Sequence, residues 1–223
     1  MKTMDSAKSL VGMLKAVKTL GTAVVWDKSA GKAHMVLGHG LNNFTPELRL
    51  AGPVHLVKTS GDILPVLQGL QDAESGHILL IEDIKPGRAL LGDIVMLAVQ
   101  QKALAGIVCL GVVRDVADAS HLKVPLWAQA CSPMAASLGK PANPAEVISM
   151  GNTRIVQGDW IFADQDGVVH VPAAHARFVI KAASIKNKKE QLYKERMLAG
   201  EALLEMMNIN GYLERGEPMR VEF

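Results

Sequence analysis

Ala105-Gly-Ile-Val-Cys-Leu-Gly-Val-Val113 is the stretch that decides the fold of this chain. It carries no charge and is followed at once by Arg114-Asp115, so it predicts a buried strand that delivers these two residues to its carboxyl end. Strands that are apolar throughout are typical of parallel sheets covered on both faces. Because function in such folds collects at the carboxyl ends of the strands, we expect the chemistry to lie there.

Upstream of this stretch, predicted strands and helices alternate. Residues 53–58 and 77–81 have the composition of strands, and residues 63–70 and 90–104 have that of helices. Strands separated by helices pair in parallel, so this half of the chain predicts an α/β sheet.

Downstream, short predicted strands are separated only by turns, which favours antiparallel pairing. Asp164-Gln-Asp-Gly167 is a hairpin signal, because Gly167 tolerates the positive φ that such turns need. The predicted strands are 124–128, 146–150, 153–156, 159–162 and 167–171.

The two ends of the chain are predicted to be helical. Residues 6–20 place apolar side chains on one stripe with lysines opposite, which predicts a helix that covers a core. A short strand over 22–26 and a loop over 31–43 follow. A long helix is expected over 173–200, and the polar tail over 214–218 is expected to be peripheral.

The composition bounds the class of protein. The chain has 223 residues, 49% hydrophobic and 21% charged, and a net charge of +2, which predicts one globular domain without a nucleic-acid or membrane partner. The dense basic run over 181–194 favours a solvated helix face, with a phosphate-binding stripe as the alternative. Cys109 and Cys131 have no disulfide or metal spacing, and no apolar run of about eighteen residues occurs, so we expect a cytoplasmic protein.

A spaced set of polar residues is the candidate site: Gly92-Asp93, then Arg114-Asp115 and Asp118. Gly92-Asp93 is predicted to open a helix, whose first amides would point outward at a positive dipole end and accept a carboxylate or phosphate. Three carboxylates and one guanidinium that converge could hold a hard divalent cation and an anionic substrate together.

Each of these residues also has a plain structural interpretation. Asp93 could simply cap its helix, Arg114 could form a surface ion pair, and Asp115 and Asp118 could cap a following helix. The seven histidines show no metal spacing, and the chain has no nucleophile elbow or P-loop. Gly38-His-Gly40 lacks the third glycine of a dinucleotide site.

The spacing of Asp93, Arg114-Asp115 and Asp118 resembles the signature of the RraA-like family, which includes 4-hydroxy-4-methyl-2-oxoglutarate/4-carboxy-4-hydroxy-2-oxoadipate aldolases and the regulator of ribonuclease activity A. Arg88-Ala-Leu-Leu-Gly-Asp93, Ser132-Pro133 and the run from Gly158 to Pro172 support the resemblance. It implies one domain over 1–223, with a core over about 20–205, peripheral ends and a long C-terminal helix. The implied fold is a mixed-sheet α/β/α-type sandwich related to swivelling β/β/α folds.

The resemblance also implies roles for the candidate residues. Asp115 would ligate Mg²⁺ or Mn²⁺ directly, while Asp93 and Asp118 would hold metal-bound waters. Arg114 would grip the pyruvyl part of a 2-oxo acid. The substrate carboxylate would lie on the amides of Gly92, Asp93, Ile94 and Val95.

Family relatives are trimers or hexamers in which a glutamate of the neighbouring subunit completes the site, and Glu190 or Glu195 is the candidate here. The implied activity is metal-dependent cleavage or decarboxylation of a 2-oxo acid through a metal-stabilised pyruvate enolate, as in aldolases and oxaloacetate decarboxylases. The alternatives are a non-catalytic regulator that binds a ribonuclease or helicase, and a scaffold whose acidic residues only cap helices.

Three stretches depart from the family pattern. Asp27-Lys-Ser-Ala-Gly31 replaces Asp-Ala-Leu-Gly after the first strand, and Asp83-Ile-Lys-Pro-Gly-Arg88 replaces half of a glycine-rich turn. A lysine usual after the Ser-Pro pair would fall at Leu138, and Lys140 is a possible substitute. The substrate itself therefore stays open.

Overall fold

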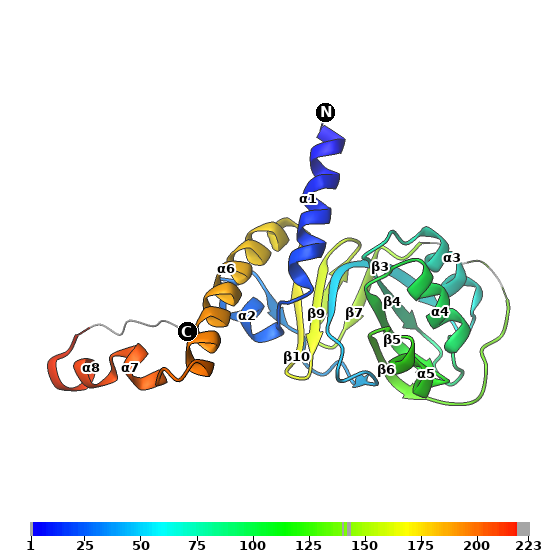
Figure 1. Ribbon diagram of the computed structural model, residues 1–223. Coiled ribbons are helices and arrows are strands. Elements are labelled where there is room, and N and C mark those ends of the chain that lie inside the picture. Colours follow the sequence, from blue (N-terminus) through cyan, green and yellow to red (C-terminus); the bar gives the residue numbers. More distant parts are fainter. Residues whose placement is uncertain (1, 140, 142–143, 218–223) are drawn as a thin grey trace.

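The computed structural model describes residues 2–139, 141 and 144–217. Two helices and two short strands open the chain, and strands and helices then alternate from β3 to β6 (Figure 1). Four short strands and a helical C-terminal region follow. The bounds of the elements are α1 Lys2–Val17, α2 Thr22–Asp27, β1 His34–Met35, β2 Asn42–Asn43, β3 Leu50–Thr59, α3 Leu64–Asp72, β4 Ile78–Asp83, α4 Asp93–Gln101, β5 Gly106–Val113, α5 Val116–His121, β6 Leu126–Cys131, β7 Val147–Met150, β8 Thr153–Val156, β9 Trp160–Asp164, β10 Gly167–Val171, α6 Ala173–Leu198, α7 Leu203–Met207 and α8 Ile209–Arg215.

One mixed sheet organises the molecule, with strand order β1-β10-β9-β3-β4-β5-β6-β2. Its β3, β4, β5 and β6 are parallel neighbours, whereas β9, β10 and the two short strands pair antiparallel. The strand β3 joins the two halves, because its first residues pair with β9 and its later residues with β4. The predicted α/β class and mixed sheet are therefore confirmed.

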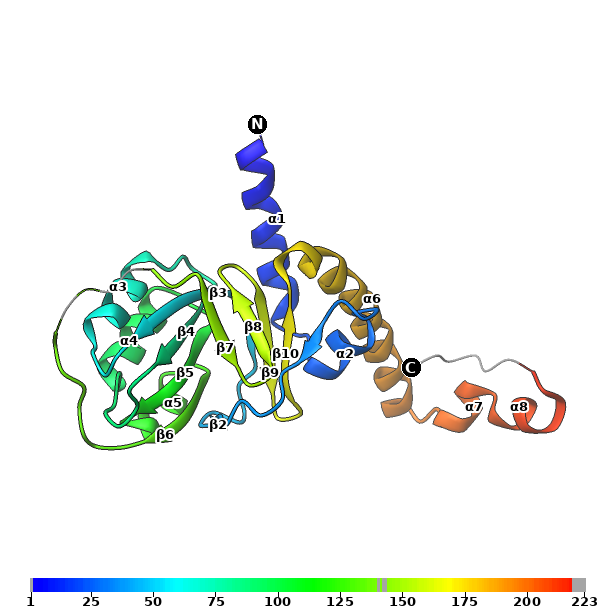
Figure 2. The same ribbon diagram turned by 180° about the vertical axis from the view of Figure 1, so that it is seen from behind.

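The parallel strands are buried on both faces, which explains their continuous apolar sequence. Every residue of β5 is buried, and its side chains alternate between two cores: Ile107 and Cys109 pack under α3 and α4, while Val108 and Leu110 face the other side. On that second side the covering layer is the antiparallel pair β7 and β8 rather than helices (Figure 2).

The antiparallel half follows the prediction with one correction. The Asp164–Gly167 turn joins β9 to β10, Gly167 pairs with Asp164, and its φ is +136°. The expectation that residues 124–128 belong to this half is wrong, because β6 pairs parallel with β5. Its crossover helix, α5, is too short for a helical period to be visible in the sequence.

The predicted strand over 22–26 is also wrong, because Thr22–Asp27 is the helix α2. Its β-branched residues favour a strand locally. The helix is held by a distant residue: the Thr22 amide and hydroxyl both donate to the Asp164 carboxylate, at 2.9 and 2.6 Å. This contact satisfies a first-turn amide of the helix.

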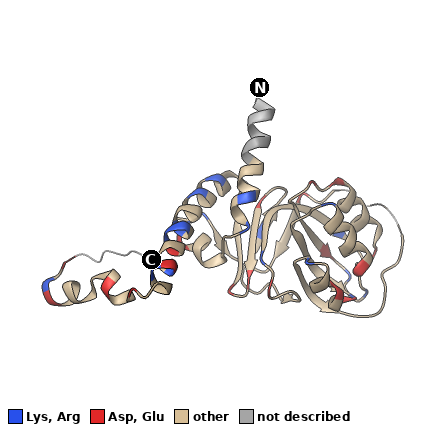
Figure 3. Cartoon of the chain, in the orientation of Figure 1, with Lys and Arg blue, Asp and Glu red and all other residues tan. Residues whose placement is uncertain are grey.

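The terminal helices cover the antiparallel half. The predicted helices near residues 6–20 and 173–200 are confirmed as α1 and α6, which pack with α2 on β9 and β10. Lys and Arg residues are concentrated along α6 (Figure 3). Most of them are exposed as predicted, but Lys186 is buried and contacts the Asp27 carboxylate at 2.5 Å and Glu190 at 3.3 Å.

Beyond α6, the chain continues as an arm formed by α7 and α8, which projects away from the sheet (Figure 1). Tyr193 and Met206 form a small apolar cluster where the arm bends. Across the part of the chain that the structure describes, no helix is both long enough and apolar enough to cross a membrane.

Candidate functional site

The strand β5 places Arg114 and Asp115 at the carboxyl edge of the parallel sheet, beside the start of α4. The Arg114 amide donates to the Leu91 carbonyl at 3.0 Å, which fixes the end of β5 against the residue before Gly92. Asp115 then takes the left-handed conformation, with φ 55° and ψ 36°, and α5 begins at the next residue. Such a conformation is uncommon outside glycine and is concentrated at functional sites.

Gly92 is the contact point between these two segments. A Cβ built on Gly92 would overlap Asp115 Oδ2, and it would lie 3.0 Å from Arg114 Cγ and 3.1 Å from Arg114 Nε. Gly92 itself has extended backbone, with φ −143°, so the glycine is required by the close approach and not by its dihedral angles. The absent side chain makes a cradle for the Asp115 carboxylate.

The polar groups around this cradle are open to solvent. Arg114 Nε lies 3.3 Å from Asp115 Oδ2, and their side chains are 40% and 39% exposed. As predicted, Gly92 and Asp93 open the helix α4. The Asp93 carboxylate accepts the Ile94 amide at 2.8 Å, so this one of the four predicted substrate-binding amides is already engaged.

The structure brings together Gly92, Arg114 and Asp115, but it does not gather the three predicted carboxylates into one group. Within the described residues, no three His, Cys, Asp or Glu side chains lie close enough to form a metal cage. Asp118 is exposed in the first turn of α5, where its amide donates to the Asp115 carbonyl at 3.1 Å. Direct ligation by Asp115, with Asp93 and Asp118 acting through water, stays a prediction.

Two further segments reach this edge, and only the second of them was connected with the substrate by the sequence, through Ser132-Pro133 and Leu138. Residues 60–63 follow β3 and residues 132–139 follow β6: the Ile63 amide donates to the Ser137 carbonyl at 2.9 Å, and the Gly139 amide donates to Asp62 Oδ1 at 3.0 Å. The rule that identified Arg114 would have found both segments, because each follows the carboxyl end of a parallel strand.

Asp83 holds the loop after β4, which departs from the glycine-rich turn of the family. Its carboxylate is buried, and its Oδ1 accepts the amides of Gly61 and Lys85 at 2.8 and 3.0 Å. Arg88 Nη1 donates to the Ala135 carbonyl at 3.3 Å. The loops after β3, β4 and β6 are therefore tied to one another at this edge of the sheet.

The two predicted glutamates lie elsewhere, whereas Leu138 belongs to the segment 132–139 described above. Glu190 and Glu195 are on α6, at the opposite end of the molecule from α4 and α5 (Figure 1), so neither reaches Arg114 of its own chain. Glu190 contacts Lys186, whereas Glu195 is exposed. Leu138 is 73% exposed, and Lys140 lies outside the described residues.

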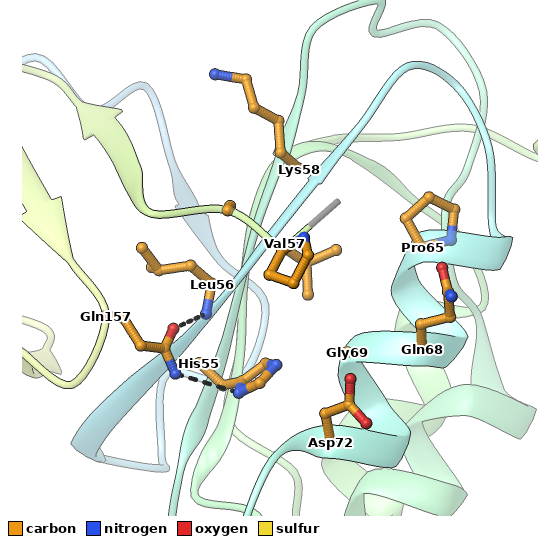
Figure 4. Close-up of a pocket in the computed structure, with 11 residues that line it drawn as sticks. His55, Leu56, Val57, Lys58, Pro65, Gln68, Gly69, Asp72 and Gln157 are labelled. Atoms are coloured by element: carbon orange, nitrogen blue, oxygen red, sulfur yellow. Dashed lines mark hydrogen bonds between the residues drawn. The ribbon is translucent and has the colours of Figure 1, made fainter. Parts of the chain in front are cut away.

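A separate cavity of about 360 Å³ lies between β3 and α3 (Figure 4). There Gln157 accepts the Leu56 amide at 2.8 Å, and its Nε2 lies 3.3 Å from His55 Nδ1. Burial lowers the pKa of His55, as it does for His77, whose ring stacks on it at 6.5 Å. Arg114 and Asp115 do not line this cavity, so it is distinct from the cradle.

Comparison with known proteins identifies the family of this chain. The family model RraA-like (Aldolase/RraA) matches residues 22–170, which include β5, Gly92, Arg114 and Asp115. The chain belongs to the RraA-like family. A protein of Halalkalibacterium halodurans, named provisionally as a 4-hydroxy-4-methyl-2-oxoglutarate aldolase, is 30% identical over 186 residues, covering 79% of this chain and 86% of that protein.

Solved structures share the RraA-like fold. An uncharacterized protein from Pseudomonas syringae pv. tomato superposes with a TM-score of 0.70 at 21% identity, over 87% of this chain and 96% of that one. The RNA-processing inhibitor RraA from Thermus thermophilis superposes with a TM-score of 0.59 at 24% identity, over 64% and 87%. At this identity the likeness establishes the fold alone. The helices α1, α6, α7 and α8 lie outside the residues that the family model matches.

Proposed function

We propose that this RraA-like protein is a divalent-metal-dependent lyase that cleaves or decarboxylates a 2-oxo acid. The observation that carries the proposal is the close approach of Gly92 to both Arg114 and Asp115. It places a carboxylate and a guanidinium side by side at the solvent-exposed carboxyl end of β5. The relatives named as aldolases support it.

The donor set fits Mg²⁺ or Mn²⁺. Mg²⁺ in proteins is usually bound through one or two carboxylates, with water and substrate completing its shell, and does not need an all-protein cage. Asp115 offers an exposed carboxylate in a glycine cradle, and Asp93 and Asp118 are the nearby acids in the sequence signature. When bound, the ion would supply Lewis-acid stabilisation for the negative charge that develops on the pyruvyl part of the substrate.

The chain's own groups would bind and orient the substrate. The Arg114 guanidinium is always charged and matches a carboxylate in a two-point contact. The guanidinium lies 3.3 Å from the Asp115 carboxylate, so a substrate bound by Arg114 would be next to a cation bound by Asp115. The positive end of α4 would add to the attraction for the substrate carboxylate, chiefly through amides other than the Ile94 amide that Asp93 holds.

The test is release of pyruvate from oxaloacetate and from hydroxy-oxo-diacids, with Mg²⁺ or Mn²⁺ and with a chelator. We expect metal-dependent turnover that Asp115→Asn abolishes without a change in thermal unfolding. Asp166→Asn, an equal change on the exposed β9–β10 turn, is the matched control and should keep full activity. Pyruvate release that is absent from the wild type, or unchanged in Asp115→Asn, would contradict the proposal.

A neighbouring copy would complete the site in this proposal, because α6 is remote from the cradle within one chain. Glu195 is the better placed of the two candidates, since its side chain is exposed while Glu190 is held by Lys186. Glu195→Gln should lower kcat without changing the oligomer seen by light scattering. If only Glu190→Gln lowers kcat, the assignment of Glu195 is wrong.

The second candidate function is a regulator that binds a ribonuclease or helicase. It is favoured by the shared fold with a protein described as an RNA-processing inhibitor. Calorimetry with Mn²⁺ separates the two functions: the lyase requires binding that depends on Asp115. No metal binding, together with specific co-purification of a ribonuclease, would favour the regulator.

A further inference from the structure

A second cavity lies at the opposite end of the parallel strands from Arg114 and Asp115. It has a volume of about 500 Å³ and is formed by the segments that lead into β3, β4, β5 and β6, together with the end of α1. This volume is in the range of about 300–1,000 Å³ that small-molecule sites occupy. The cavity shares no residue with the proposed lyase site, so a ligand here would be a separate one.

The charges on this cavity all have one sign. Lys18, Arg49 and Lys123 line it, and none of its other lining residues among those that the structure describes carries a carboxylate. The chain as a whole is nearly balanced, with 24 Lys and Arg against 22 Asp and Glu, so this local excess is not simply the composition. A local positive potential of this kind raises the concentration of anions near the cavity.

These three cations have no acidic partner within the part of the chain that the structure describes. The ion pairs there involve other lysines, arginines and a histidine. Arg49 Nη1 donates to the Thr19 carbonyl at 3.2 Å, which holds the guanidinium at the rim. A Cβ on Gly21 would lie 3.9 Å from Arg49 Nη2 and 3.3 Å from Asp164 Oδ2, so a carboxylate that already binds Thr22 lies on the far side of this guanidinium.

The floor of the cavity is apolar and well packed. Leu14, Val17 and Leu104 contribute hydrocarbon surface, and Val17 is buried. The wall formed by α1 is close to the loop before β4: a Cβ on Gly76 would lie 2.6 Å from Leu14 Cδ1, and Gly76 has φ +82°. The cavity therefore combines an apolar interior with a cationic rim.

We propose that this cavity binds a small amphipathic carboxylate, such as a medium-chain or aromatic acid. The hydrocarbon part would lie on the floor, where its burial is favourable, and the carboxylate would meet the guanidinium and the two ammonium groups. A small anion without a hydrocarbon part would gain only solvent-screened attraction to exposed cations. The apolar floor and the cationic rim thus both select the ligand.

Calorimetry on the full chain with sodium octanoate tests this proposal. We expect one site per chain, with acetate, inorganic phosphate and octanol each at least tenfold weaker than octanoate. The charge reversal Lys18→Glu/Lys123→Glu should weaken octanoate at least tenfold. Both lysines are exposed, so thermal unfolding should be unchanged, and Lys188→Glu on the exposed face of α6 is the control with wild-type affinity.

Three results would overturn the proposal. Octanoate that does not bind would remove the site. Equal affinity of octanoate and octanol, or of the wild type and the charge-reversed variant, would show that the cations are not used. Phosphate as tight as octanoate would show that the apolar floor is not used. None of these outcomes depends on lyase activity, so failure here is distinguishable from failure of the proposed function.

Discussion

Replacement of Gly92 by alanine is the sharpest test of the site geometry, because it adds one methyl group to the cradle. The new Cβ would lie 3.0 Å from Arg114 Cγ, whereas carbon atoms settle at about 3.5–4.0 Å. Arg114 must therefore retreat by at least about 0.5 Å. Asp115 Oδ2, which the Cβ would overlap, must move further.

The expected effect is a large loss of activity with a small loss of stability. A misplacement of about 1 Å at a catalytic group costs on the order of 100-fold in rate, so kcat/KM for pyruvate release should fall by about that factor. The side chains that must move are 40% and 39% exposed, so their displacement should cost little stability. The helix loses only a favourable N-cap glycine, at about 0.5–1 kcal/mol. That corresponds to a fall in Tm of about 1–4 °C.

The assay compares Gly92→Ala with Gly12→Ala, a control on α1 where no atom lies within 4 Å of the new Cβ. The control should keep wild-type kcat/KM. Apparent affinity for Mn²⁺, followed by electron paramagnetic resonance, should weaken in Gly92→Ala only. Wild-type kcat/KM and metal affinity in Gly92→Ala, in a protein that Asp115→Asn inactivates, would refute the reasoning from close approach.

Three further predictions concern stability. Gly69→Ala would place a Cβ against Val57 where α3 packs on β3. The overpacking should outweigh the better helix propensity of alanine and lower the free energy of unfolding in urea by about 1–2 kcal/mol. An unchanged urea midpoint would contradict this. Burial lowers the pKa of His170 despite its aspartate partner, so its contribution to stability is present above the unfolded pKa of about 6.5 and is lost as the pH falls below it. The free energy of unfolding should therefore be lower at pH 5.5 than at pH 7.5, and His170→Gln should reduce that difference; an equal difference in the variant would remove His170 as the cause. Lys186→Met removes the contact between α6 and Asp27 and should lower the free energy of unfolding by about 1–2 kcal/mol. This is less than for a fully buried pair, because the Asp27 carboxylate reaches solvent. A stability equal to that of the wild type would show that the pair contributes nothing.

The parallel half of the fold was predictable because its signal is local. The strand β5 runs over the residues expected from its apolar stretch, since both faces of it are buried. The same stretch placed Arg114 and Asp115 correctly at its carboxyl end. Gly92 beside them could be predicted as a helix start, but its contact with Asp115 depends on how two segments pack, which spacing does not encode.

The errors have a common physical cause in long-range partners. Residues 22–26 have strand composition, but their helix depends on Asp164 and on packing against α6. The parallel pairing of β6 depends on the neighbour that it finds in the sheet, not on its own residues. Tertiary contacts of this kind override local propensity.

The bond between Thr22 and Asp164 spans 142 residues, and this has a consequence for biosynthesis. A ribosome releases α2 long before it translates the acceptor that holds the first turn of that helix. The first turn of α2 can therefore gain this contact only after Asp164 has been translated, when the residues of all four parallel strands have already been made. Chains arrested before residue 164 should present the apolar side of residues 22–26 to chaperones, and completion of the β9–β10 hairpin should end that exposure.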